Sequence, residues 1–338
     1  MDMADASYGG YALCREMLES PQIVRRFQPD AGARFADAIR GKRALLLTGE
    51  GSSRVFPAKQ TIYRALCSGN RLPIFSEGAT QALEYDLSGA AVFGASNSGK
   101  TKEVVRLFTK LRQAQHDAVF AVVAEPDTPV IELSNQGHVL TCGKEAAVAA
   151  TKSVIEQALF FASVEAALGD VPLLGLDELS DQMQQVLELR IDAGIVQKLA
   201  RAPTIYFAGR NNGVAEELRL KTNEIARKKA DYLEGTYAVH GIEEVMLRDE
   251  VVVLVDPFAA EEAKLRECLV DGVGMHAVAL APRQTSFPTV RIPDGGTYRG
   301  FVELCAGWNL LVETGLATGI DLDHPARARK VGNEFEGR

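Results

Sequence analysis

The stretch Gly94-Ala95-Ser96-Asn97-Ser98-Gly99-Lys100-Thr101 follows the apolar run Ala90–Phe93 and precedes apolar residues that recur with helical spacing from Val104. A strand, a tight turn and a helix in this order are typical of parallel α/β sheets. The turn carries two glycines and three hydroxyls at the N-terminus of the expected helix, where backbone N–H groups and the helix dipole favour an anion. The stretch therefore predicts an α/β fold and a phosphate site, without identifying the molecule that carries the phosphate.

Short β-type runs alternate with longer helical patterns on both sides of this stretch. Two helices are expected in residues 10–40, and further helices near 56–67, 101–114 and 150–168. The expected strands of the first half are Leu45–Leu47, Ala90–Phe93, Val119–Val123 and Val139–Leu140. Strands that are separated by helices predict a parallel sheet that is covered on both faces.

A second set of strands follows at an offset of about 160 residues. Its members are Ile205–Gly209, Val251–Val255 and Ala277–Leu280, and a late helix at 301–318 matches the one at 150–168. We therefore predict an α/β fold of two tandem, doubly wound, flavodoxin-like parallel-sheet domains that are related by internal duplication. The predicted divisions are N-terminal helices at 1–40, a first domain with the phosphate loop at 41–175, a helical linker at 176–200, a second domain at 201–319 and a C-terminal tail at 320–338.

The composition argues against several classes of protein. The chain has 338 residues, of which 46% are apolar and 24% charged, and its net charge of -8 disfavours binding to nucleic acid or anionic membranes. Five scattered cysteines without a C-x-x-C motif argue against a disulfide framework or a zinc site. The polar N-terminus does not resemble a signal peptide, and no run approaches the roughly 20 apolar residues of a membrane span. We expect a soluble, cytoplasmic protein without a metal.

One alternative is a nucleotide hydrolase, because residues 94–101 also match the pattern G-x-x-x-x-G-K-T. Such an enzyme needs a second apolar strand that ends in a magnesium-binding aspartate, and Val251–Asp256 has that form. The phosphate loop, however, follows the second strand of its unit. Asp256 falls in the other repeat and precedes Pro257, which favours an ordinary strand end. We therefore disfavour the nucleotide interpretation.

Six short motifs, in chain order, resemble those of the sugar isomerase (SIS) domain family. They are Gly51-Ser52-Ser53, the S-x-S-G-x-T loop Ser96–Thr101, Val148-Ala149-Ala150-Thr151-Lys152, Leu220-Lys221-Thr222-Asn223-Glu224, His240-Gly241, and Asp323-His324-Pro325 followed by Lys330. The resemblance covers about residues 40 to 330. It is closest to two-domain members such as the isomerase half of glucosamine-6-phosphate synthase and stand-alone glucosamine-6-phosphate deaminases.

The resemblance implies a metal-independent enzyme, without a cofactor, that binds a hexose 6-phosphate. The residues implied to bind the phosphate are Ser52, Ser53, Ser96, Asn97, Ser98 and Thr101. Hydroxyls and backbone amides can bind a monophosphate without magnesium, and each hydrogen bond to a charged group is worth roughly 1.5–3 kcal/mol. Val148 and Ala150 are implied to contact the sugar.

Four residues are implied to act on the sugar. Glu224 would move a proton between C1 and C2, and Lys221, three residues earlier on the same predicted helix face, would lie near O1 or C1. His240 would open the hexose ring and would come from the partner subunit of a homodimer with composite active sites. Lys330 would approach the sugar carbonyl from the C-terminal tail. His116, His138 and His276 are expected to be structural, while the role of His324, in the tail near the site, is left open.

Three departures from the family pattern affect the expected activity. Only about 40 residues precede the first expected strand, so the chain is not expected to take ammonia from glutamine. Ala150 stands where the synthase has a serine, and Lys100 stands where many members have glutamate. We expect a phosphosugar isomerase or deaminase that converts glucosamine 6-phosphate to fructose 6-phosphate and ammonia. The alternatives are a fructosamine-6-phosphate deglycase, a plain aldose–ketose isomerase and a non-catalytic phosphosugar-binding sensor.

Overall fold

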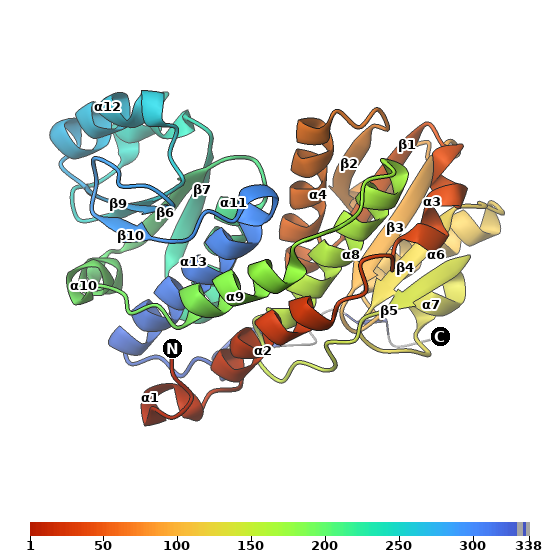
Figure 1. Cartoon of the computed structure of the whole chain (residues 1–338), viewed down its shortest axis with the longest axis horizontal. Coiled ribbons are helices and arrows are strands. Elements are labelled where there is room, and N and C mark those ends of the chain that lie inside the picture. The colour runs from red at the N-terminus through yellow and green to blue at the C-terminus, as the bar shows by residue number, and fades with distance from the viewer. Residues whose placement is uncertain (330–333, 336–338) are drawn as a thin grey trace. The chain divides into compact units, whose positions relative to one another are not determined.

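The computed structural model describes residues 1–329 and 334–335, which form two compact units with one five-stranded sheet each (Figure 1). The first-sheet unit comprises Gln22–Ala146, Ala150–Asp177 and the described tail residues from Arg329. The second-sheet unit comprises Met1–Pro21, Ala147–Ala149 and Glu178–Ala328. The first-sheet unit thus begins at Gln22, inside the segment that was predicted as N-terminal helices.

The first sheet is parallel throughout and has the strand order β2-β1-β3-β4-β5. Its strands are β1 (Ala44–Gly49), β2 (Ile74–Gly78), β3 (Ala90–Ser96), β4 (Val119–Val123) and β5 (Gln136–Val139). Its helices are α3 (Ala33–Arg40), α4 (Val55–Ser68), α5 (Ala79–Ala82), α6 (Lys102–Gln113), α7 (Pro129–Leu133) and α8 (Lys152–Leu168). Two more helices, α1 (Ala6–Gly9) and α2 (Ala12–Arg26), precede them.

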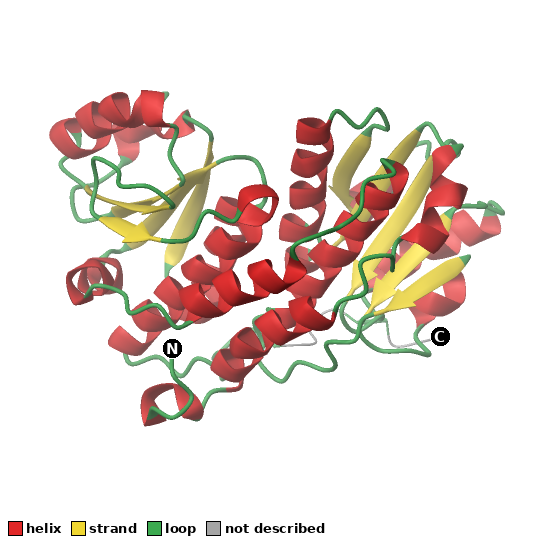
Figure 2. Ribbon diagram, in the orientation of Figure 1, coloured by secondary structure: helices red, strands yellow, loops and turns green. Residues whose placement is uncertain are grey.

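Helices lie on both faces of this sheet (Figure 2) because alternate strand residues are apolar on each side. On one face, Phe93 and Phe120 pack with Phe35 of α3 and Phe160 of α8, and the ring centroids lie 5.0–5.7 Å apart. On the other face, Val92 and Ala121 belong to a buried cluster with the apolar stripe of α6. Both faces therefore exclude water along the centre of the sheet.

The second sheet repeats this strand order as β7-β6-β8-β9-β10 and is also parallel. Its strands are β6 (Thr204–Gly209), β7 (Lys229–Glu234), β8 (Val251–Val255), β9 (His276–Ala281) and β10 (Thr289–Arg291). The helices after α8 are α9 (Leu176–Leu187), α10 (Ala193–Arg201), α11 (Val214–Lys221), α12 (Glu262–Leu265) and α13 (Arg299–Ala317). Two tandem α/β sheets are thus confirmed, while their origin by internal duplication stays a prediction.

Three strands were not predicted, and one was misplaced. β2, β7 and β10 are edge strands, where half-exposed positions tolerate polar residues and weaken the apolar pattern. The strand that was predicted at Val139–Leu140 is in fact β5, which begins at Gln136 and includes the polar His138. β5 is an edge strand too, so the same reason applies.

A close contact between helices leads to a test of the packing in the first-sheet unit. A Cβ atom on Gly32, which precedes α3, would lie 2.3 Å from the backbone nitrogen of Val164 in α8. We expect Gly32→Ala to lower the free energy of unfolding by about 2 kcal/mol or more, because backbone atoms cannot move aside without displacing a helix. Urea denaturation would measure this change.

Gly41→Ala is the matched control, since Gly41 ends the same helix with φ −85° and a Cβ atom there would meet nothing within 4 Å. We expect it to leave stability within about 0.5 kcal/mol of the original chain. Equal effects of the two substitutions would contradict the proposed helix contact.

Candidate functional site

The predicted phosphate loop joins β3 to α6 at the carboxyl edge of the first sheet. Ser96 is the last strand residue, and its Oγ lies 2.7 Å from Thr101 Oγ1 across the loop. The Ser98 hydroxyl accepts a hydrogen bond of 3.2 Å from the Lys100 backbone. Hydroxyls and backbone N–H groups thus gather in one short turn before a 12-residue helix, which is an arrangement that suits a phosphate.

Gly99 shapes this loop because no larger residue fits its position. Its φ of +65° is in the left-handed region, and a Cβ atom would lie 2.2 Å from the hydroxyl oxygen of buried Thr128. The loop is therefore held against the segment that follows β4, where the Val130 N–H also donates to the Gly99 carbonyl.

The turn that carries Ser52 and Ser53 lies at the same edge of the sheet. It forms a short 3₁₀ helix, η1 (Gly51–Ser53), directly after β1, and β1 pairs with β3 so that Gly49 faces Ala95. A Cβ atom on Gly49 would lie 2.7 Å from the Ala95 carbonyl oxygen, so glycine permits this close approach. The fold thus brings the ends of two adjacent strands together, as the sequence predicted.

Glu145, which was not predicted from the sequence as a site residue, holds the loop in place. Its side chain is buried and accepts hydrogen bonds from Asn97 Nδ2 at 2.8 Å, Ser153 Oγ at 2.7 Å and the Thr151 backbone at 2.7 Å. The same carboxylate therefore fixes Asn97 and the start of α8. No local motif marks Glu145, because its partners lie both 48 residues before it and a few residues after it.

Part of the C-terminal tail contacts the phosphate loop. The Phe335 N–H donates to the Lys100 carbonyl at 2.8 Å, and Glu334 forms a β-bridge with Thr101. The Phe335 side chain packs against the buried cluster around α6. Lys330, which was predicted to act at the sugar carbonyl, lies outside the described residues.

Lys221 and Glu224 are brought together in the second-sheet unit. α11 ends at Lys221 and continues as a π-helical turn, Thr222–Ala226, which places Lys221 Nζ 2.8 Å from Glu224 Oε2. Lys221 also lies 3.5 Å from Glu217 Oε1, and the side chains of Lys221 and Glu217 are fully buried. Glu224 keeps 26% of its side chain exposed. A buried ammonium thus orients a carboxylate that solvent and small molecules can reach.

His240 is exposed and belongs to the same unit. It follows the short 3₁₀ helix Tyr237–Val239, and its Nε2 lies 3.3 Å from Thr236 Oγ1. The two residues implied to contact the sugar, Val148 and Ala150, are half-buried between β5 and α8. Val148 is assigned to the second-sheet unit and Ala150 to the first.

The carboxyl edge of the second sheet carries ion pairs instead of a hydroxyl-rich loop. Asp256 directly follows β8 with φ +41°, and its Oδ2 lies 2.8 Å from both Arg210 Nη1 and Arg299 Nη1. The two guanidinium groups are therefore already paired with a carboxylate of the protein itself. Glu303 of α13 is buried nearby, and burial raises its pKa to about 7.

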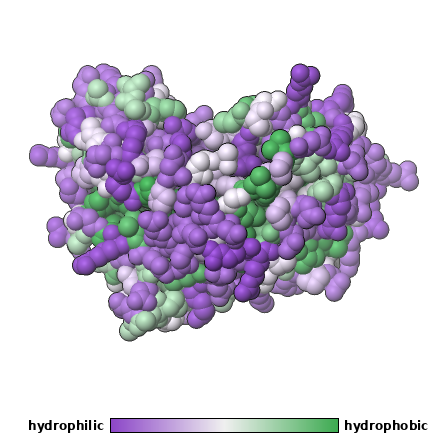
Figure 3. Space-filling model, viewed as in Figure 1, coloured by the Kyte–Doolittle hydropathy of each residue, from purple (hydrophilic) through white to green (hydrophobic). Residues whose placement is uncertain are grey.

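Neither a metal cluster nor a membrane-spanning helix is found in the described part of the chain. Among residues 1–329 and 334–335, no group of three or more His, Cys, Asp and Glu side chains could hold a metal ion. Within that same part of the chain, no helix is both long and apolar enough to cross a membrane. The face drawn in Figure 3 is largely hydrophilic, with scattered apolar patches.

Comparison with known proteins identifies the fold. No protein-family model matches the sequence, and no curated protein matches it. The C-terminal domain of glucosamine-fructose-6-phosphate aminotransferase from Francisella tularensis matches the structure with a TM-score of 0.78 and 18% identity, over 95% of this chain and 100% of that chain. Tagatose-6-phosphate ketose/aldose isomerase from Escherichia coli matches with a TM-score of 0.79 and 18% identity, over 96% and 99%.

Glucosamine-6-phosphate deaminase from Thermotoga maritima matches with a TM-score of 0.75 and 18% identity, over 94% of this chain and 97% of that chain. In each of the three comparisons the match covers almost all of both chains, so the shared architecture includes both sheets. At such identities the likeness shows the fold. The fold that the sequence resemblance predicted is thereby confirmed.

The buried carboxyl of Glu303 leads to a prediction about pH. Because its folded-state pKa is raised from 4.5 to about 7, the folded chain holds a proton that the unfolded chain releases above pH 4.5. The free energy of unfolding should therefore fall as pH rises from about 5 to 7, by up to about 3 kcal/mol from this group. Glu303→Gln should remove that part of the pH dependence and make the chain more stable than the original at pH 8.

Denaturation of both chains at pH 5 and pH 8 would measure the difference. Glu267→Gln, at an exposed position, is the control and should leave the pH dependence unchanged. Parallel pH profiles for Glu303→Gln and the original chain would refute the assignment of this titration to Glu303.

Proposed function

We propose that this chain is a phosphosugar isomerase or deaminase that acts on a hexose 6-phosphate, with glucosamine 6-phosphate as substrate and fructose 6-phosphate and ammonia as products. The observation that carries the proposal is the contact between buried Lys221 and partly exposed Glu224. A lysine without solvent access that is aimed at an accessible carboxylate suits a proton-transfer site better than a surface ion pair. The sugar-phosphate names of the matching structures support the same class of substrate.

The phosphate loop would hold the substrate by its 6-phosphate. Ser96, Ser98 and Thr101 supply hydroxyls, and the N-terminus of α6 adds the favourable end of the helix dipole. These hydroxyl and backbone N–H groups can donate hydrogen bonds to the phosphate oxygens, so a dianion can bind without a metal. Lys100, half-exposed in the same loop, adds a positive charge beside the phosphate.

In the proposed reaction His240 opens the ring by taking the O1 proton and giving one to O5. Glu224 then removes the proton from C2 and returns it to C1, while O1 gains a proton and the amino nitrogen loses one, which gives the 2-imino form of the ketose. Water adds to the C2 imine carbon, and ammonia leaves, so that one water is consumed for each ammonia released. Lys221 keeps Glu224 oriented through their 2.8 Å contact, and Lys330 is proposed to act at the sugar carbonyl.

A homodimer with composite sites is part of the proposal. His240 is exposed, and Tyr237 and Val245 beside it expose 51% and 66% of their surface. Exposed apolar residues around a polar catalytic candidate are typical of a surface that a partner covers. We propose that His240 of each subunit serves the site of the other.

The test is turnover in the presence of EDTA with three substrates, glucosamine 6-phosphate, fructose 6-phosphate and a fructosyl-amino-acid 6-phosphate. Release of ammonia from the first is expected. Sugar interconversion alone would instead identify a plain isomerase. Release of an amine from the fructosyl-amino-acid 6-phosphate would identify a deglycase. Tight binding without any turnover would identify a sensor and overturn the proposed enzyme.

Glu224→Gln should lower kcat by about 100-fold or more and leave phosphosugar binding in place, because it removes the base and keeps the shape of the side chain. The matched control is Glu267→Gln, which removes the carboxylate of another Lys–Glu pair three residues apart, Lys264 and Glu267, on an exposed surface. Full turnover by the Glu224 variant would contradict the role of that carboxylate.

A further inference from the structure

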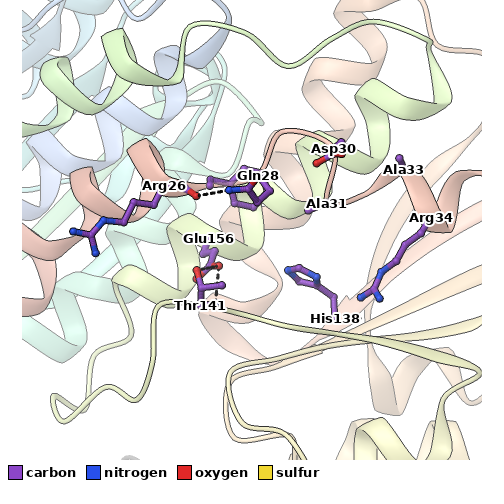
Figure 4. A pocket seen from close by; sticks show the side chains of 10 residues that line it. Arg26, Gln28, Asp30, Ala31, Ala33, Arg34, His138, Thr141 and Glu156 are labelled. Atoms are coloured by element: carbon purple, nitrogen blue, oxygen red, sulfur yellow. Dashed lines mark hydrogen bonds between the residues drawn. The ribbon is translucent and has the colours of Figure 1, made fainter.

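A cavity of about 490 Å³ lies in the first-sheet unit, and none of the predicted site residues lines it. It is bounded by the segment between α2 and α3, by β5 and by the start of α8 (Figure 4). Its polar lining residues come from these elements and the residues next to them, namely Arg26, Gln28, Asp30, Arg34, His138, Thr141 and Glu156. Its volume is in the range of small-molecule sites in proteins.

His138 gives the first sign that the cavity binds a ligand. Its ring stacks on Phe160 with centroids 4.2 Å apart and planes 15° apart, so its orientation is fixed. Its Nε2 is buried and has no hydrogen-bond partner among the described residues. Burial, with the nearby charge of Arg34, lowers the pKa of His138 to about 4, so the ring is neutral near pH 7. An unpaired buried nitrogen of this kind is unfavourable unless another molecule supplies the partner.

Arg34 supplies positive charge on the same side of the cavity. Its guanidinium donates to the Gly137 carbonyl at 2.8 Å and lies 4.8 Å from the centre of the Phe35 ring. These two contacts hold the side chain beside His138, as Figure 4 shows. A guanidinium has five N–H donors, so a bound anion can be recognised while the Gly137 contact persists.

Glu156 forms a fixed acceptor on another wall. Its carboxylate is buried and receives hydrogen bonds from the Thr141 backbone at 2.8 Å, the Thr141 hydroxyl at 2.7 Å and the Cys142 backbone at 2.7 Å. Gln28, whose Nε2 donates to the Arg26 carbonyl, projects from the segment after α2. The cavity thus offers a cationic group on one side and acceptors for hydroxyl donors on the other.

We propose that this cavity is a second ligand site, for a small polyhydroxylated anion such as a sugar acid or a sugar phosphate. The anionic group would pair with Arg34. A hydroxyl would satisfy His138 Nε2, and further hydroxyls would bind Gln28 and the acceptors on the Glu156 wall. The site is independent of the proposed catalytic function, because none of these residues belongs to the phosphate loop or to the Lys221–Glu224 pair.

The ring signal of His138 in NMR spectra of histidine-labelled protein is a local reporter for the test. His138→Gln assigns the signal, and gluconate and glucose 6-phosphate are the two probes. A saturable shift with gluconate alone identifies the ligand class as sugar acids, and a shift with glucose 6-phosphate alone identifies it as sugar phosphates. Shifts with both probes mean that the site recognises the anionic group and hydroxyls that the two share. Absence of a saturable shift with either probe at millimolar concentration overturns the proposal.

Variants locate the binding. Arg34→Gln should raise the dissociation constant at least about tenfold, because a charged hydrogen bond is lost. Arg25→Gln is the matched control, since Arg25 is exposed nearby but does not line the cavity, and it should change affinity less than twofold. Gln28→Ala, at an exposed position, gives a second variant that the fold should tolerate. Equal affinities across the Arg34, Gln28 and Arg25 variants overturn the site.

Ser98→Ala separates this site from the phosphate loop. We expect the dissociation constant reported by His138 to be unchanged in this variant. A dissociation constant that rises with Ser98→Ala and not with Arg34→Gln would mean that the signal reports the phosphate loop, and the proposal would fail while the proposed function stood.

Discussion

The position of the proposed phosphate loop depends on the hydrogen bonds that the buried Glu145 carboxylate accepts. It binds Asn97 in the loop and Ser153 and the Thr151 backbone at the start of α8, so a single charge joins two segments that are far apart in sequence. A buried carboxylate is tolerable only when its oxygens are satisfied, and these donors satisfy it. Loss of any one of them would leave a charged acceptor or a polar donor unpaired inside the unit. The geometry of the loop is therefore set by a rigid neighbour, which suits a site that must hold a phosphate in one position.

The two sheets share a strand order but end in different chemistry. At the carboxyl edge of the first, hydroxyls and backbone N–H groups surround a glycine turn that a side chain would block. At the matching edge of the second, Asp256 already pairs with two arginines, so those cationic groups are satisfied from within the chain. One topology thus carries the proposed phosphate loop in one unit and an internal ion-pair network in the other. This difference supports the proposal that only the first sheet's edge binds phosphate.

Features that depend on local sequence patterns were predicted from the sequence, and features that depend on contacts between distant segments were not. Buried central strands such as β4 follow from runs of apolar residues and were predicted. The three-residue spacing of Lys221 and Glu224 predicted that they share a helix face, and the structure shows their side chains in contact. Edge strands such as β7 escaped prediction because half of their residues face solvent. The role of Glu145 and the unpaired nitrogen of His138 escaped it because their surroundings come from segments dozens of residues apart. His138, which was expected to be structural, is now the centre of a proposed ligand site.

The most direct test of the account is calorimetric titration, in EDTA, with fructose 6-phosphate and with fructose. The titrated chain carries Arg34→Gln, which weakens the proposed second site and leaves residues 94–101 as the site under test. The account predicts that only the phosphorylated sugar binds, and that Ser98→Ala weakens its binding about 10- to 100-fold, as expected for the loss of one hydrogen bond to a charged group. Equal binding of the two sugars, or unchanged affinity in the Ser98 variant, would contradict the assignment of residues 94–101 as the phosphate site.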